Sequence, residues 1–142
     1  MTTEKNKWID AAGKLLQLTQ DGKLKWQPRD APAYLNLEPD RKRVEVVYEA
    51  KYNSRKLRLY QFSYKVEKPR SSLGALKDLA AYVNPHEYPY WTTKTALELL
   101  DQSGFGAWTF PETEVLEDLA VAVRYQVAEV KEFLDEILAV AS

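Results

Sequence analysis

An aromatic stripe bordered by charged side chains is the part of this sequence most suited to binding another molecule. Tyr60, Phe62 and Tyr64 alternate within RLYQFSYKV, residues 58–66, and alternate residues of a strand share one face. Tyrosine and arginine are enriched at the energetic centres of protein interfaces. The candidate binding residues on this stripe and on the strand beside it are Glu49, Lys51, Arg58, Tyr60, Phe62 and Tyr64.

Acid–base or nucleophilic catalysis has little support in the sequence. The single histidine, His86, lies between a proline and a glutamate, so we expect it in a loop. No serine stands in a G-x-S-x-G motif, and the glycines of SGFG lack the lysine of a phosphate-binding loop. Glu45 and Glu49 are predicted to share a strand face with their Cα atoms roughly 13 Å apart, which is wide for paired catalytic carboxylates. We expect no catalytic residue and no enzymatic activity.

The composition excludes several kinds of metal and redox site. Zero cysteines exclude disulfides and thiolate ligands, and one histidine excludes a multi-histidine metal site built from a single chain. Carboxylates alone could still hold a metal ion, because such a site leaves no signature in residue spacing. We expect neither a metal ion nor a cofactor.

The totals fit one globular domain, residues 1–142, with 45% hydrophobic and 29% charged residues. No segment approaches the ~20 apolar residues of a membrane span. The N-terminal residues contain no apolar run of the kind that a signal peptide has. We therefore expect no membrane association and a cytoplasmic location, in a bacterium or a phage.

Charge is distributed unevenly, although the formal net charge is only −1. Residues 41–70 hold ten Lys or Arg against three acids, whereas residues 95–142 hold two Lys or Arg against ten acids. A basic sheet with aromatic residues could stack bases and contact the phosphates of a single-stranded nucleic acid. The sequence pI of about 5.9 and the presence of Glu45 and Glu49 beside the stripe disfavour this hypothesis.

The element that must position the stripe is a β-hairpin over residues 44–66. Apolar and polar residues alternate along VEVVYEAKY and again along LRLYQFSYKV, as in two half-buried strands. If Ser54 and Arg55 form the centre of the turn NSRK, Tyr60 lies opposite Glu49 on the neighbouring strand.

Three helices are predicted from apolar residues that recur three or four positions apart. They cover residues 4–20, residues 71–83 and the last 27 or so residues, where the apolar stripe continues for about six turns. Thr109 and Glu112 fit a capping box at the start of the last helix.

Two further strand regions complete the predicted sheet. KLKW, residues 23–26, reads as a short strand, and residues 95–110 read as a hairpin that turns at QSGFG. The expected fold is α+β: a single antiparallel sheet of about five strands, with an N-terminal helix, a short middle helix and a long C-terminal helix packed mainly on one face.

The stripe raises the question of what covers it, because Leu57 and Leu59, with Val44, are expected to face the helices. A β-bulge near Leu59–Tyr60 could turn both sets of residues toward one core. Residues 71–83 or the loop NPHEYPYW could instead cover the second face. In the third interpretation the stripe is an exposed patch, and such patches usually bind a partner.

We expect a small interaction or regulatory protein that binds another protein, or a second copy of itself, through the aromatic, charge-rimmed face. The alternative is a small-ligand or nucleotide-binding domain, in which the aromatic rings stack on the ligand while Arg58 and Lys51 bind its anionic groups. A third hypothesis, single-stranded nucleic-acid binding by residues 41–70, is disfavoured by the charge balance.

Overall fold

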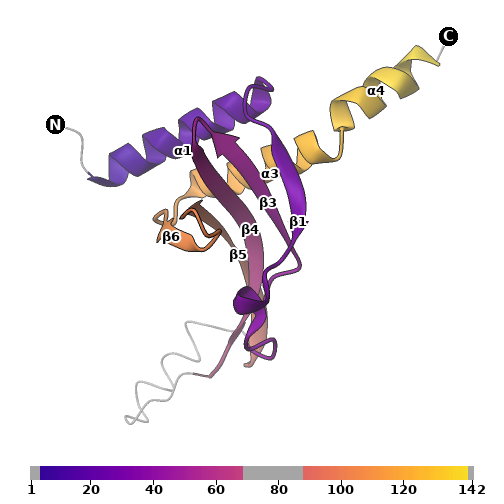
Figure 1. Ribbon diagram of the computed structural model, residues 1–142. Helices are drawn as coiled ribbons and strands as arrows, with labels where there is room; N and C mark the ends of the chain where they lie inside the picture. Colours follow the sequence, from indigo (N-terminus) through magenta and orange to yellow (C-terminus); the bar gives the residue numbers. More distant parts are fainter. Residues whose placement is uncertain (1–3, 69–87, 141–142) are drawn as a thin grey trace.

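An antiparallel sheet with helices on one face forms the body of the protein in a computed structural model (Figure 1). The structure describes residues 4–68 and 88–140. The predicted helix over residues 71–83 and His86 lie outside the described residues. In chain order, the described elements are α1 (Glu4–Gln20), β1 (Trp26–Asp30), the 3-10 helix η1 (Ala33–Asn36), β2 (Lys42–Arg43), β3 (Val46–Tyr52), β4 (Arg55–Val66), β5 (Tyr90–Leu100), β6 (Gly106–Thr109), α3 (Glu114–Val127) and α4 (Val130–Ala139).

The expected α+β class is confirmed. The strands follow the order β1-β3-β4-β5-β6, and β2 pairs with β4 beside β3. Every strand pair is antiparallel. None of the helices in the described part of the chain is long and apolar enough to cross a membrane.

The main core lies between the sheet and the helices α1 and α3, which pack on the same face (Figure 1). Leu59 and Leu97 supply its floor from the two central strands, and Leu119 and Val123 meet them from α3. Each of these four side chains is almost fully buried, and full burial of such a side chain contributes about 1.5–3 kcal/mol. This core fixes one face of β4 firmly and leaves the stripe on the other face.

The turn between β3 and β4 lies one residue earlier than the sequence predicts. Tyr52 pairs with Arg55, so Asn53 and Ser54 form the loop, and Asn53 adopts a left-handed conformation with φ 56°. Asparagine tolerates this conformation better than most residues. The predicted register is therefore wrong by two residues, and Glu49 pairs with Arg58. A two-residue shift keeps every side chain on its predicted face.

The chain before β3 contains one residue more than its partner strand. From Arg43 to Val47 the chain advances four residues, while the paired positions in β4 advance three, from Ser63 to Tyr60. Such an irregularity is a β-bulge in its residue count. It turns Val44 away from the helices, so the prediction that Val44 faces them is wrong.

The predicted hairpin over residues 95–110 is confirmed, because β5 pairs with β6. The carboxylate of Asp101 accepts hydrogen bonds from the backbone N–H groups of Ser103, at 2.8 Å, and Phe105, at 3.0 Å. The predicted capping box is wrong: Thr109 is the last residue of β6, and Thr113 is the N-cap of α3.

The long C-terminal helix is interrupted. α3 ends at Val127, and Glu129 adopts a left-handed conformation with φ 54° before α4 begins. Neither glycine nor proline marks this break in the sequence. Figure 1 shows α4 extending away from the sheet, beyond the region that α1 and α3 cover.

Candidate functional site

The second face of the sheet is covered by a segment that sequence periodicity did not single out. Leu35 of η1 and Val44 pack with Val47, Tyr60 and Ala96 in a second buried cluster. The first of the three interpretations, a β-bulge near Leu59–Tyr60, is excluded, since β4 pairs with β5 without a shift from Leu57 to Val66. The described cover of Tyr60 is therefore the stretch from η1 to β2, which belongs to the same chain.

Arg58 of β4 is buried beneath η1 and is not part of an open surface. Its guanidinium donates to the Tyr34 hydroxyl at 2.5 Å and to the Gly104 carbonyl at 3.0 Å. It also pairs with the Glu49 carboxylate at 3.5 Å, and the Arg58 side chain is only 5% exposed. These contacts join η1, β3 and the β5–β6 turn around one buried cation. The Nε of Arg58 is also buried, and none of the described residues accepts a hydrogen bond from it.

Tyr60 forms the other half of the polar cluster. Its hydroxyl donates a short hydrogen bond to the carboxylate of Glu98 on β5, and both residues are buried. Burial first, and then the hydrogen bond to Glu98, raise the pKa of the Tyr60 phenol. Tyr60 therefore stays protonated and acts as a fixed donor.

The outer part of the stripe is shielded by lysines. The ammonium group of Lys42 lies 4.6 Å from the centre of the Phe62 ring, and that of Lys94 lies 5.4 Å from the centre of the Tyr64 ring. Lys94 also pairs with Glu112 at 3.3 Å, and hydrogen bonds to Glu112 and then Tyr64 raise the pKa of Lys94. Cation–π contacts of this kind contribute about 0.5–1 kcal/mol at exposed sites.

The six candidate binding residues thus lie partly within the second buried cluster and partly around its edge. Arg58 and Tyr60 are buried, Glu49 contacts Arg58, and Phe62 and Tyr64 are half-buried. The sixth, Lys51, is exposed near the hairpin turn and pairs with Lys56 in the ladder. The stripe with its neighbours therefore holds η1 to the sheet, and the open surfaces lie elsewhere.

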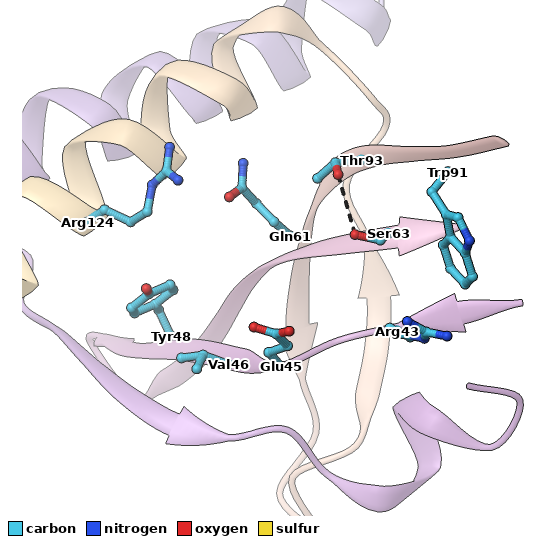
Figure 2. A pocket seen from close by; sticks show the side chains of 9 residues that line it. All are labelled: Arg43, Glu45, Val46, Tyr48, Gln61, Ser63, Trp91, Thr93 and Arg124. Atoms are coloured by element: carbon cyan, nitrogen blue, oxygen red, sulfur yellow. Dashed lines mark hydrogen bonds between the residues drawn. The ribbon is translucent and has the colours of Figure 1, made fainter. Parts of the chain in front are cut away.

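The helix-bearing face has an open region where α3 ends. Here lies a hollow of about 520 Å³, hereafter the trough, within the range of small-ligand sites. Figure 2 shows its lining side chains around the uncovered sheet. They are Arg43, Glu45, Val46, Tyr48, Gln61, Ser63, Trp91, Thr93 and Arg124.

Six of the nine side chains that line the trough are polar or charged, whereas the core beside it is apolar. Gln61 and Ser63 continue the face of β4 that carries Leu59, so this face changes from apolar to polar along one strand. The β-bulge places both Glu45 and Val46 against the trough, although neighbouring residues of a regular strand point to opposite faces. Glu45 and Glu49 are therefore on opposite faces, contrary to the prediction.

A second exposed feature is α4, none of whose residues is buried. The apolar residues of its stripe are exposed to between 42% and 80%. They are Phe133, Leu134, Ile137 and Leu138, with Val140 just beyond the helix. The opposite side carries Lys131, Glu132, Asp135 and Glu136.

Sequence reasoning placed the α4 residues in one continuous apolar stripe with those of α3, and it did not identify the trough. The change from Leu59 to Gln61 and Ser63 on one strand face was the available signal for the trough. No protein family, no curated protein and no solved structure matches the chain. The α+β fold, the trough and α4 are therefore the features from which a function can be inferred.

Proposed function

We propose that the protein is an interaction protein that associates with a second copy of itself through the apolar stripe of α4. The observation that carries the proposal is the exposure of four large apolar side chains along α4, with a fifth just beyond its end, on a helix that buries none of its own residues. Apolar patches of more than a few hundred Å² are rare on soluble monomers and usually mark interaction sites. The aromatic face, which the sequence favoured, is replaced by α4 in this proposal because Arg58 and Tyr60 are buried.

The spacing of the stripe favours a second helix as the occupant. Val130, Phe133, Ile137 and Val140 follow the alternating three- and four-residue steps that let helices interlock side chains. Two copies of one such stripe are self-complementary about a two-fold axis. A helix of ten residues is about 15 Å long, so the contact is smaller than a standard interface. We expect dissociation constants of about 1–100 μM.

The acidic polar side of α4 allows two kinds of partner to be distinguished, a second α4 and a basic protein. The polar side of α4 carries Glu132, Asp135 and Glu136 against Lys131, so two paired copies bring like charges together. Salt screens this repulsion, and the association of two copies should strengthen as salt rises. Binding of α4 to a basic partner would weaken under the same change.

The test is sedimentation equilibrium between 1 and 200 μM, in low and in high salt, with the double variant Phe133→Asp and Ile137→Asp. We expect the wild type to dimerise and the double variant to remain monomeric. Its melting temperature should be nearly unchanged, because exposed substitutions usually alter stability by less than about 0.5 kcal/mol. Lys131→Asp is the matched control, since it makes the same change in net charge on the polar side, and it should still dimerise in high salt.

A wild type that stays monomeric at 200 μM in high salt contradicts the proposal. Dimers of the double variant as tight as those of the wild type contradict it equally. If dimerisation weakens as the salt concentration rises, the two α4 helices do not pair with each other. The two copies would then associate through another surface.

A further inference from the structure

The trough carries its charged groups in a fixed order along the strands. In Figure 2, Glu45 lies between Arg124, which comes from α3, and Arg43 of β2. Tyr48 pairs with Leu59, and Arg43 pairs with Ser63, so the trough follows β4 over four residue-to-residue steps. That length is about 13 Å at the rise of an extended strand. The order of charges is positive, negative and positive.

Arg43 is held in place and still has donors to offer. Its Nε donates to the Pro39 carbonyl at 2.7 Å, and its guanidinium lies 4.5 Å from the centre of the Trp91 ring. The described residues provide no partner for its two terminal nitrogens. A guanidinium fixed by stacking loses less conformational entropy when it binds a carboxylate.

The other two charges are also available. Arg124 is exposed, and neither its guanidinium nor the carboxylate of Glu45 forms a hydrogen bond or ion pair within the described ranges 4–68 and 88–140. A ligand would therefore meet three charged groups that the fold itself does not neutralise. The β-bulge, which re-aims Glu45 toward the trough, is the kind of irregularity that recurs beside functional sites.

Neutral hydrogen-bonding groups lie between the charges. The Gln61 amide reaches Thr95 at 3.4 Å, and the hydroxyls of Ser63 and Thr93 are 3.4 Å apart. These contacts are longer than typical hydrogen bonds and therefore weak. Amide and hydroxyl groups both donate and accept, so this row can bond the N–H and C=O groups of a peptide backbone.

We propose that the trough binds an extended peptide segment that carries acidic, basic and acidic side chains at alternate positions. Alternate residues of an extended chain lie on one side and are about 6.6 Å apart, so the outer two are separated by about the length of the trough. The acidic side chains meet Arg124 and Arg43, and the basic one meets Glu45. A nucleic acid fits less well, because its backbone offers only negative charge to Glu45. This site is independent of self-association, since no residue of α4 lines the trough.

The test compares two labelled peptides by fluorescence anisotropy at low salt. One is acetyl-Glu-Thr-Lys-Thr-Glu-amide, and the other has the inverted charges, acetyl-Lys-Thr-Glu-Thr-Lys-amide. We expect the wild type to bind the first peptide at least about tenfold more tightly. Arg124→Glu should remove that preference, because it replaces a cation that meets an acidic side chain of the first peptide. Arg124 is exposed, so the substitution leaves the core intact. Arg55→Glu is the matched control, since it reverses an exposed cation that does not line the trough.

Equal affinity for the two peptides overturns the proposal, and so does the absence of binding at about 1 mM peptide. An equal loss of affinity in Arg124→Glu and Arg55→Glu also overturns it, because it shows attraction to overall charge only. Tighter binding of an oligothymidine than of the first peptide assigns the trough to nucleic acid instead. Sedimentation of the same variants reports on α4 separately, so failure at one site is distinguishable from failure at the other.

Discussion

Replacing Tyr60 with phenylalanine should destabilise the protein by about 1.5–3 kcal/mol. The substitution keeps the buried ring but removes the hydroxyl that donates to the carboxylate of Glu98. Hydrogen bonds to charged groups contribute about this much to stability. Glu98 is itself buried, with 6% of its surface exposed, so water cannot readily replace the lost donor.

Urea unfolding at pH 7 is the appropriate assay, because it gives the free energy of unfolding and a slope that reports compactness. We expect a lower midpoint with an unchanged slope. For a chain of 142 residues, the loss corresponds to a melting temperature roughly 4–10 °C lower. Tyr52→Phe is the matched control: this tyrosine is 45% exposed, so its variant should differ from the wild type by less than about 0.5 kcal/mol.

A double-mutant cycle separates the bond from the packing. Tyr60→Phe combined with Glu98→Leu removes both partners, and should lose less than the sum of the two single variants. Equal stability of Tyr60→Phe and Tyr52→Phe would contradict a stabilising hydrogen bond between Tyr60 and Glu98. That result would mean that solvent reaches Glu98 and that the cluster under η1 is open in solution.

Two further predictions concern the same cluster. The raised pKa of Tyr60 predicts how the free energy of unfolding depends on pH. Above pH 10.0, the ordinary pKa of a tyrosine, the unfolded chain releases a proton that the folded protein keeps, so stability falls as pH rises. The slope is at most about 1.4 kcal/mol per pH unit. The deficit of Tyr60→Phe relative to the wild type should therefore shrink between pH 10 and about pH 11.5 in urea titrations, and a constant deficit contradicts the assignment. Gly106→Ala should destabilise the protein by about 1–3 kcal/mol, because the new Cβ would overlap the carboxylate of Glu98, which Tyr60 holds in place. Gly13→Ala is its control: nothing lies within 4 Å of the new Cβ in α1, and thermal melts should show a gain of up to about 1 kcal/mol.

The sequence was sufficient to assign the two faces of β4. Leu57 and Leu59 face the helices and Tyr60 faces away, as the alternation predicts. This result did not depend on the register, because a two-residue error returns every side chain to the same face. The error itself came from the turn, where Asn53 adopts the left-handed conformation that the prediction had not used.

The cover of the second face was not predictable from periodicity. Leu35 comes from a four-residue 3-10 helix between prolines and polar residues, too short to show a helical pattern. Val44 precedes a β-bulge, and one extra residue reverses the face that alternation assigns. Periodicity therefore left open whether Tyr60 is covered or exposed, and two separate segments bury it.

The C-terminal region shows a different limit. An apolar stripe from Leu116 to Ile137 has the same spacing whether a core or a second molecule covers it. In the structure its first half is buried and its second half is exposed, with the break at Glu129 between them. Periodicity identifies an apolar face, but the length of the sheet beneath it decides how much of that face the chain itself can bury.

The end of α3 connects the two proposed binding surfaces. The side-chain amide of Gln126 accepts from the Trp26 N–H at 2.8 Å and donates to the carbonyls of Leu24, at 2.8 Å, and Thr19, at 3.2 Å. Three hydrogen bonds between one side chain and the backbone thus fasten the last turn of α3 to the end of α1, the start of β1 and the chain between them. Arg124 lies in that turn, so the clamp holds the start of its side chain beside the trough. These bonds also fix the chain three residues before Glu129, the left-handed residue after which α4 begins. A rigid support followed by an exposed helix is the arrangement that a protein needs if one face is to hold a peptide while its C-terminal helix pairs with a second copy.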